Sequence, residues 1–397
     1  MIYPFNAAYY SEKNRAQLSA LAVADLDTAE HLWGGPDNTR AFRNVLVGTP
    51  DRRGETWQAW ITMGDIEYSD DSLFYVLHTT QRIGRKQIDR WAIYATIDVN
   101  EPSLFIHEDV LPEGVERARQ ATEACESDMA PIFVGCEESL AKDLRKTLRA
   151  AIKGSPALLE FKEGPGVKHR VWPVPAGPGA EAITKIFAGA PLFLLDGHHR
   201  LAAARENHRF GMGDGRLLTC ITSMAESDTL ILPLHRAVRY ERWVLPDQLN
   251  ADLVRAGCRL TELPDLKVGD IGEYVMKHKE AGPFCVVLHS YADMPTLVCL
   301  PRGAGQPEAL AALSVACLDF GVLAPITDAT SIPVPSTELA LEQLALDQAQ
   351  VAFFLPPASP REVRAIALAK LRMPRKSTRF VPKPSLGLIA RPWTNSG

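Results

Sequence analysis

The stretch PLFLLDGHHRLAAAR, residues 191–205, decides the local fold of the middle of the chain. Its apolar run at 192–195 predicts a buried strand, and Gly197 suits a tight turn directly after it. The alanine-rich run around Leu201 then predicts a helix that begins near His198. The sequence therefore predicts a strand, a glycine turn and a helix, the kind of unit from which α/β proteins are built.

The polar residues of this turn predict an anion site. Amides at a helix N-terminus, with the helix dipole behind them, bind anions, and Gly197 lets a phosphate approach the backbone. Arg200 would add a bidentate phosphate contact, and Asp196 would bind a magnesium ion or hold a histidine tautomer. His198 and His199 would supply donors or proton-transfer groups. The alternative is that Asp196 caps the helix and both histidines are structural, but five consecutive polar or small residues favour a site.

Upstream of the turn, residues 99–240 continue the α/β pattern. Leucine or isoleucine at 140, 144, 148 and 152 predicts one buried helix face, and a second helix is expected through Gly114–Cys125. Short strands are expected near Pro131 and from His169 to Trp172. The apolar triplet Leu104-Phe-Ile is followed directly by a further group of polar residues.

That group, His107-Glu108-Asp109, is open to several interpretations. A glutamate near a strand end is more often a solvated or capping carboxylate than a base. Position 111 is Leu, so there is no HExxH motif and the zincin interpretation fails. A mononuclear metal site made from His107, Asp196 and one histidine of the 198–199 pair stays open.

The regions on either side are predicted to be α+β. Residues 1–98 predict a helix near Lys13–Trp33 and strands that include Glu55–Met63. Residues 241–397 contain Ser359-Pro360-Arg361-Glu362, a capping box with proline at the first helical position, which predicts a helix to about Leu371. The expected fold is therefore α/β (α+β), with a central domain between N- and C-terminal α+β regions.

Composition bounds the class of protein. The chain has 397 residues, of which 46% are hydrophobic and 23% charged, so it has ample length to bury a core. Seven cysteines occur singly, without a CxxC pair, which favours a reduced cytoplasmic compartment. No apolar run approaches the ~18 residues of a membrane span. A net charge of −5 disfavours nucleic acid as the main partner.

Charge is unevenly distributed along the chain. Residues 356–397, called the basic tail below, carry nine Lys or Arg and one Glu, a net +8, so the preceding 355 residues carry −13. Within the tail, residues 373–383 combine prolines, hydroxyls and cations, and we expect them to fold onto the body and meet anionic ligands. Lys376-Ser377-Thr378 lacks the spacing of a P-loop, and a solvated surface stays open as the alternative. The segment 232–236, with His235 and Arg236, is open to the same two interpretations.

Several motifs occur together in an order that resembles a known family. The chain is similar to the bacterial and archaeal family called domain of unknown function 1015. The motifs that carry the resemblance are Phe105-Ile-His107-Glu108, Pro131-Ile-Phe133, Val171-Trp172, Asp196-Gly-His-His-Arg200, Leu232-Pro-Leu-His235-Arg236 and Met373-Pro-Arg-Lys-Ser-Thr378. This resemblance covers nearly the whole chain, but it implies no activity.

The middle region also resembles the ParB/sulfiredoxin superfamily, which includes free-serine kinases. That resemblance implies that Glu108 is the catalytic base and that the turn at 196–200 holds nucleotide phosphates. The chain departs from the pattern in having Leu104-Phe-Ile before His107 and about 58 residues between Phe133 and Pro191. ParB's arginine-rich turn and sulfiredoxin's reactive cysteine are absent, which disfavours DNA partition and sulfinic-acid reduction.

The function implied is a nucleotide-dependent phosphotransferase with an alcohol group as acceptor, most like a kinase of free serine or a related amino acid. Its expected cofactors are magnesium, held by Asp196, and ATP or ADP. The expected site residues are, for catalysis, His107, Glu108, Asp196 and His199; for phosphate binding, Gly197, His198, His199, Arg200, Lys376, Ser377 and Thr378; and as candidate substrate or phosphate contacts, Trp172, His235, Arg236 and Lys383. The alternatives are a non-catalytic nucleotide-binding regulatory protein and a metal-dependent hydrolase that uses the histidine-rich turn.

Overall fold

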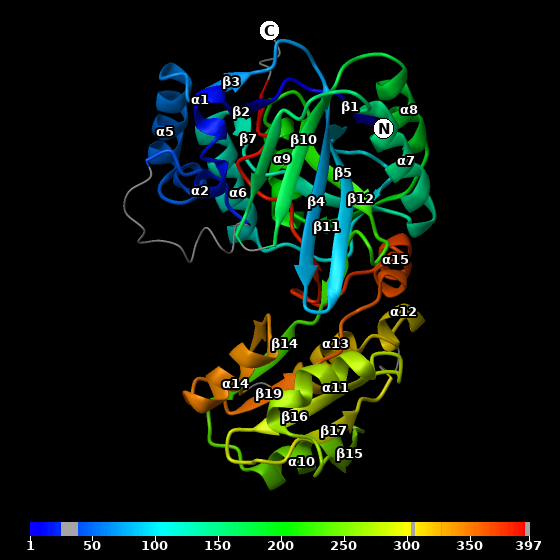
Figure 1. The fold of residues 1–397 in the computed structure, drawn as a ribbon. Coiled ribbons are helices and arrows are strands. Elements are labelled where there is room, and N and C mark those ends of the chain that lie inside the picture. Colours follow the sequence, from blue (N-terminus) through cyan, green and yellow to red (C-terminus); the bar gives the residue numbers. More distant parts are fainter. Residues whose placement is uncertain (25–38, 165, 303–305, 327, 394–397) are drawn as a thin grey trace. The chain divides into compact units, whose positions relative to one another are not determined.

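The computed structural model describes residues 1–24, 39–164, 166–302, 306–326 and 328–393, and its fold is mixed α/β, as the sequence predicted (Figure 1). The chain divides into two compact units. Unit 1 comprises Met1–Ile106, Val110–Leu230 and Pro382–Gly397, and unit 2 comprises His107–Asp109 and Ile231–Val381. The chain therefore passes from one unit to the other several times.

This division differs from the three consecutive regions predicted, 1–98, 99–240 and 241–397. Strands β4 (Phe74–Ile83) and β5 (Lys86–Asp98) come from the predicted N-terminal region, yet they pair with β10 and β12 of the predicted central region. The hydrogen bonds of one sheet thus join the two regions into a single unit. The N-terminal region is not a domain of its own, because its strands lie in the middle of that sheet.

Unit 1 is built around a large mixed sheet. Its strands follow the order β6-β11-β8-β12-β5-β4-β10-β9, and β1 pairs with β5 beside this path. Short ladders also join β2 to β3 and β7 to β21. Besides β4 and β5, the described strands of unit 1 are β1 (Ile2–Tyr3), β2 (Ala8–Tyr10), β3 (Ile66–Tyr68), β6 (Leu104–Phe105), β7 (Ser127–Asp128), β8 (Ile132–Cys136), β9 (Leu159–Lys162), β10 (Lys168–Val174), β11 (Leu192–Asp196), β12 (Arg216–Ser223) and β21 (Arg391–Pro392).

Helices cover the unit 1 sheet, and α7 and α8 pack together on one face (Figure 1). Leu144 and Leu148 of α7 are fully buried there, as the i+4 spacing predicted, and each contributes about 1.5–3 kcal/mol by burial. The helices of unit 1 are α1 (Glu12–Arg15), α2 (Leu18–Leu21), α4 (Arg43–Leu46), α5 (Pro50–Thr62), α6 (Pro112–Cys125), α7 (Ala141–Ala151), α8 (Pro178–Ile186) and α9 (His198–Arg209), with a 3-10 turn η1 (Glu138–Leu140).

The N-terminal part differs from the sequence predictions at one segment and extends beyond the described residues at another. Glu55–Met63, expected as a strand, lies almost entirely in α5, because Trp57 and Trp60 are both buried on one helix face. Of the helix expected over Lys13–Trp33, α1 and α2 form its first part, and residues 25–38 lie outside the described residues.

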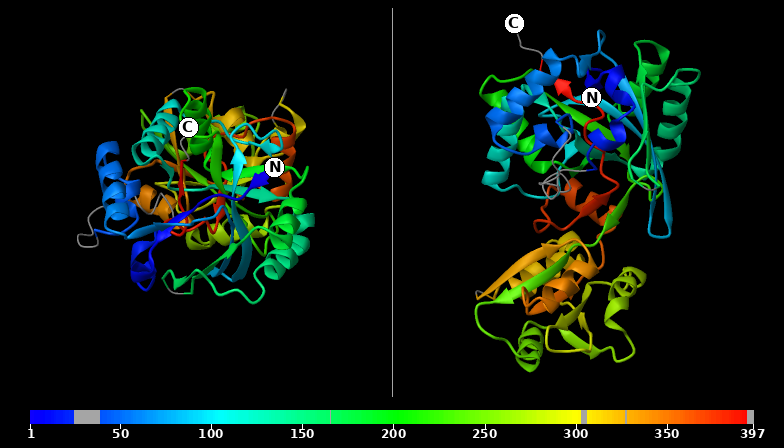
Figure 2. Two further views of the ribbon diagram at one scale, coloured as in Figure 1. Left: turned by 90° about the horizontal axis from the view of Figure 1, so that it is seen from above. Right: turned by 60° about the vertical axis from the view of Figure 1, so that its left-hand side comes forward.

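The end of the chain belongs to unit 1. In the right-hand view of Figure 2 the red C-terminal segment runs beside the blue N-terminal elements. Backbone bridges Ala8↔Ala390 and Val23↔Leu386 hold it there. The buried Arg391 side chain bonds the carboxylates of Asp128 and Asp214. The segment of the basic tail around residues 386–391 is therefore folded, with the charge of Arg391 paired.

Unit 2 contains an antiparallel sheet with the order β15-β17-β16-β19-β14-β18. A short ladder joins β13 to β20. The strands are β13 (Leu230–Leu232), β14 (His235–Tyr240), β15 (Arg259–Glu262), β16 (Phe284–His289), β17 (Thr296–Cys299), β18 (Ala329–Val334), β19 (Val351–Phe354) and β20 (Arg379–Val381).

One face of this sheet packs against α11 and α14, whose buried residues, such as Val275 and Leu344, share a core with Val286 and Phe354. The predicted capping box at Ser359 is confirmed, and α15 ends at Leu368, three residues before the predicted end. The helices are α10 (Pro246–Arg255), α11 (Ile271–Lys277), α12 (Glu308–Ala311), α13 (Ser314–Ala316), α14 (Thr337–Ala345) and α15 (Pro360–Leu368), with 3-10 turn η2 (Val268–Asp270) and π-helix η3 (Cys317–Leu323).

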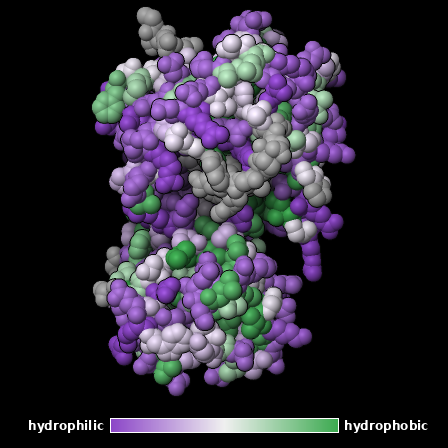
Figure 3. All heavy atoms as spheres, turned by 90° about the vertical axis from the view of Figure 1, so that its left-hand side faces the viewer, coloured by the Kyte–Doolittle hydropathy of each residue, from purple (hydrophilic) through white to green (hydrophobic). Residues whose placement is uncertain are grey.

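The surface is largely hydrophilic, with hydrophobic residues gathered on part of the unit 2 face shown in Figure 3. Exposed large hydrophobic residues of unit 2 include Ile332, Leu339 and Leu346. Such residues are normal on a folded surface and identify no partner by themselves. Across the described ranges, none of the helices combines the length and the apolar character needed to span a membrane.

Candidate functional site

The predicted strand–turn–helix is present at residues 192–209 of unit 1. Strand β11 ends at Asp196, Gly197 has the left-handed angle φ +98°, and α9 begins at His198. The first helical hydrogen bond runs from the Leu201 N–H to the Gly197 carbonyl at 3.0 Å. The amides of the first helical turn therefore have no acceptor within the helix and carry the positive end of its dipole.

Two cations meet the carboxylate of Asp196. Nη2 of Arg200 donates to Oδ2 at 2.8 Å, and Nζ of Lys383 lies 3.5 Å from Oδ1. Burial acts to raise the pKa of Asp196, but Lys383 and Arg200 outweigh it and lower the pKa to about 2. Asp196 is thus ionised near neutral pH, and the cluster of these three side chains carries a net charge of about +1.

His199 has a contact that the sequence did not indicate. Its Nε2 accepts a hydrogen bond of 3.0 Å from the backbone N–H of Leu111, which precedes α6. The ring also packs on Gly114, where an added Cβ would lie only 2.4 Å from His199 Cδ2. Because Nε2 accepts, the ring proton lies on Nδ1 and His199 ties α9 to the start of α6.

In unit 2, His107 and Glu108 lie against the basic tail. The Met373 N–H donates to the His107 carbonyl at 2.8 Å, and Glu108 forms a parallel bridge with Met373. The backbone N–H of Lys376 donates to Glu108 Oε1 at 2.9 Å. Residues separated by more than 260 positions in the sequence thus hold the candidate base in one orientation.

The hydroxyls of the same segment also bond within unit 2. His107, which is fully buried, places Nε2 3.1 Å from Oγ1 of Thr378. The Ser377 hydroxyl donates to the Pro374 carbonyl and is itself buried. Lys376 adopts the left-handed angle φ +53° and is exposed. Of these three tail residues, Lys376 therefore has the side chain that is most accessible to a ligand.

Arg236 and His235 do not fit the role of substrate contacts. Arg236 has a side chain only 3% exposed; it binds the carboxylate of Asp319 through Nε and Nη2 and the carbonyl of Lys376 through Nη1 at 3.1 Å. His235 places Nε2 3.1 Å from Thr337 Oγ1 and accepts from the Leu355 N–H through Nδ1. Burial lowers the pKa of His235 to about 4. The polar groups of both side chains are bonded to other groups of the protein.

Trp172 also lies away from the turn. It belongs to β10 and stacks with Trp91, at a ring-centroid distance of 6.3 Å. Strands β8, β12, β5 and β4 separate β10 from β11 in the sheet. At about 4.8 Å per strand, this places Trp172 about 24 Å from β11, too far to share a ligand with it.

Sequence reasoning missed two residues that anchor the tail. Asp319 neutralises Arg236, which in turn binds the backbone carbonyls of Arg375 and Lys376. Arg90 of β5 donates to the carbonyls of Pro382 and Lys383. The sequence did contain a signal for Arg90. It is the one charged residue on the part of a strand face that is otherwise occupied by Ile88, Ala92 and Tyr94, which indicates a buried arginine.

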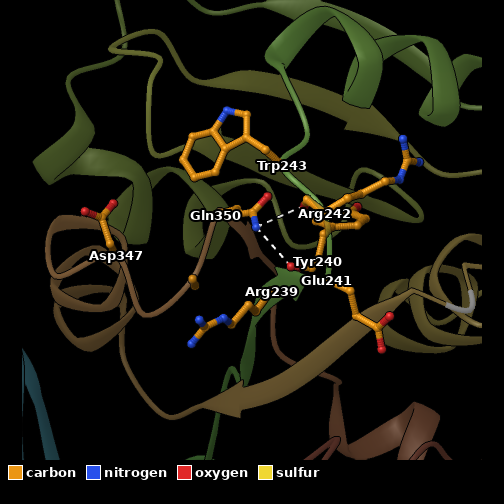
Figure 4. Close-up of a pocket in the computed structure, with 8 residues that line it drawn as sticks. Arg239, Tyr240, Glu241, Arg242, Trp243, Asp347 and Gln350 are labelled. Atoms are coloured by element: carbon orange, nitrogen blue, oxygen red, sulfur yellow. Dashed lines mark hydrogen bonds between the residues drawn. The ribbon is translucent and has the colours of Figure 1, made fainter.

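Two clefts of unit 2 are lined by residues other than the predicted site residues. One cleft, of about 470 Å³, lies between the end of β14 and the α14–β19 connection, and Figure 4 shows its lining. Gln350 holds it by donating to the carbonyls of Tyr240 and Arg242. A second cleft, of about 560 Å³, is lined by residues that include Tyr274 and His278. None of the sequence-predicted site residues lines either cleft.

A metal centre of protein ligands alone is not found in the described ranges, which contain no group of three or more His, Cys, Asp or Glu side chains suited to hold an ion. The metal-dependent hydrolase considered above would need such a group. A magnesium ion has a different requirement, since one or two carboxylates and substrate phosphates suffice to hold it. Asp196, ionised at the start of α9, has the donor chemistry for that ion.

Comparison with solved structures gives similarities of low degree. A free serine kinase variant in complex with AMP has 12% identity and a TM-score of 0.41, with 74% of this chain and 91% of that chain covered. A conserved hypothetical protein from Pyrococcus furiosus has 11% identity and a TM-score of 0.39, with 75% and 93% covered. SbnI with a C-terminal truncation, from Staphylococcus aureus, has 13% identity and a TM-score of 0.40, with 72% and 82% covered. At these scores the likeness carries no conclusion about activity.

Comparison of the sequences gives a firmer result. No curated protein matches the chain. The family model described as "Protein of unknown function (DUF1015)" matches residues 4–309, which is well over half of the chain. The resemblance predicted from the ordered motifs is therefore confirmed, and the chain belongs to the DUF1015 family.

Proposed function

We propose that the protein is a nucleotide-dependent phosphotransferase that acts on a small hydroxylated metabolite, of the class of free serine or a related hydroxy amino acid. The observation that carries this proposal is the charge arrangement at the start of α9. There Arg200 and Lys383 flank one ionised carboxylate, Asp196, beside a left-handed glycine. The net positive charge and the helix dipole both favour a phosphate.

Within this function Asp196 would hold a magnesium ion, which would neutralise part of the charge of the nucleotide phosphates. Arg200 and Lys383 would then contact Asp196 less closely and would bind phosphate oxygens. Arg200 suits this because its planar fork matches two phosphate oxygens at once. Gly197 contributes backbone that a phosphate can approach closely.

Glu108 would act as general base. The hydrogen bond from the Lys376 N–H holds its carboxylate in one orientation, which a base requires in order to reach a substrate hydroxyl. The carboxylate takes the hydroxyl proton while the substrate oxygen forms a bond to the terminal phosphorus. The bond from that phosphorus to the bridging oxygen breaks, and the shortened nucleotide leaves with the electron pair.

The test is incubation of the full chain with ATP or ADP, magnesium and a panel of free amino acids, with detection of phosphorylated product. Glu108→Gln keeps the size of the side chain but removes the base, so turnover should fall by roughly 10²–10⁴ with nucleotide affinity little changed. Asp109→Asn is the matched control, because Asp109 is exposed and forms an ion pair with Arg372. It should keep full turnover.

Two outcomes would overturn this assignment. Full turnover in Glu108→Gln would eliminate Glu108 as the base. Nucleotide binding without phosphorylated product from any acceptor would select the non-catalytic nucleotide-binding protein instead.

A further inference from the structure

Arg90 is a fully buried cation beside the backbone of the basic tail. It is 0% exposed, and its guanidinium lies 5.3 Å from the ring centroid of Phe133. Its Nη1 donates to the carbonyl of Pro382, and its Nη2 donates to that of Lys383 at 3.4 Å. No carboxylate of the described part of the chain lies within ion-pair distance of it.

Burying a guanidinium without a carboxylate partner is costly, so a role for it is expected that an apolar residue could not fill. The planar fork of arginine can serve two neighbouring carbonyls at once, whereas a lysine presents a single nitrogen. Arg90 therefore holds the two peptide groups on either side of Lys383.

The side chain that this backbone carries is Lys383. Its Nζ lies 3.5 Å from Asp196 Oδ1, and its side chain is only 17% exposed. Prolines at 382 and 384 restrict the backbone on either side of it. Phe133, under the Arg90 guanidinium, is also the strand partner of Asp196. A continuous set of contacts within unit 1 thus connects Arg90 to the turn.

We propose that Arg90 is a positioning residue that holds Lys383 over the turn at 196–200, so that the Lys383 ammonium faces Asp196 and an anion bound there. The positioning of Lys383 stands on the contacts of unit 1 alone. Its effect on nucleotide binding rests on the proposed function.

The first measurement needs no ligand. An amine-reactive ester is added to the full chain, and the labelling rate of each lysine is followed by mass spectrometry, with exposed Lys162 as the internal reference. In Arg90→Met, Lys383 should be labelled roughly tenfold faster than in the wild type, because its segment opens locally. Arg149→Met, which removes an exposed arginine over Trp91, is the control and should leave the Lys383 rate unchanged.

The second measurement is the ATP affinity of Arg90→Met, Lys383→Met and the double variant, by calorimetry. Arg90→Met should weaken binding roughly tenfold in the wild-type background and cause no further loss in the Lys383→Met background. Equal losses in both backgrounds would mean a merely structural role and would overturn the proposal.

An unchanged Lys383 labelling rate in folded Arg90→Met would also overturn it. Faster labelling, with no ATP binding by the wild type, would keep the positioning role and refute the proposed function instead. Should Arg90→Met fail to fold, Arg90→Lys replaces it, because it keeps the charge but lacks the planar fork whose two nitrogens each serve one carbonyl; the same increase in labelling is expected.

Discussion

Replacing Gly197 with alanine should destabilise unit 1 more than the same change at Gly189. Both glycines have left-handed backbones, with φ +98° at Gly197 and φ +74° at Gly189. An alanine in that conformation costs about 1–2 kcal/mol at either position. The loss of unfolded-chain entropy on going from glycine to alanine is also common to both.

The surroundings of the two glycines differ. At Gly197 an added Cβ would lie 2.8 Å from Ile132 Cγ2 and 2.8 Å from Arg200 Nη2, whereas nothing lies within 4 Å at Gly189. The Arg200 guanidinium can move aside, but Ile132 is fully buried in the core. Displacing a buried side chain costs about 1–3 kcal/mol, so this is the expected difference between the two variants.

Urea unfolding followed by tryptophan fluorescence measures this difference. The assay reports mainly on unit 1, because six of the seven tryptophans fall within its residue ranges and only Trp243 falls in unit 2. A Gly197→Ala variant no less stable than Gly189→Ala would refute the inference that the turn needs a glycine for close packing. It would also weaken the case for close approach of a phosphate at this position.

Two further predictions concern unit 2. The pKa of His235 is about 4 when folded against an ordinary value of 6.5, so the unfolded chain binds the proton first and stability falls as the pH drops from about 6.5 to about 4, by up to about 3 kcal/mol. His235→Gln should remove this loss in urea unfolding at neutral pH and near pH 5, and an unchanged pH dependence would contradict the assignment. Lys376→Ala should weaken ATP binding and flatten its dependence on ionic strength, measured by calorimetry, whereas the exposed control Lys370→Ala should leave both unchanged.

Local patterns in the sequence were sufficient to predict β11, the glycine turn and α9. The signals here are an apolar run, a residue that tolerates positive φ and a series of good helix formers. Each acts on its immediate neighbours in the chain, so the secondary structure of this segment depends little on tertiary packing. The capping box of α15 was predictable for the same reason, since its donor and acceptor lie three residues apart. Glu55–Met63 was assigned wrongly because its apolar residues fit both a strand and a helix period, and only the burial of Trp57 and Trp60 on one face decides between them.

The surroundings of the candidate site were decided by tertiary structure. Nothing local indicates that Arg90 binds a backbone 292 residues away, or that Asp319 takes up the charge of Arg236 and leaves it no donor for a phosphate. Trp172 was expected as a substrate or phosphate contact but lies several strands from the turn, because strand order is set by the packing of the whole sheet. The sequence by itself determined the strand, the glycine turn and the helix, and which polar side chains stand at the turn. Only the fold decided which buried charges face them, because an ion pair or a carbonyl contact depends on distance in space rather than along the chain.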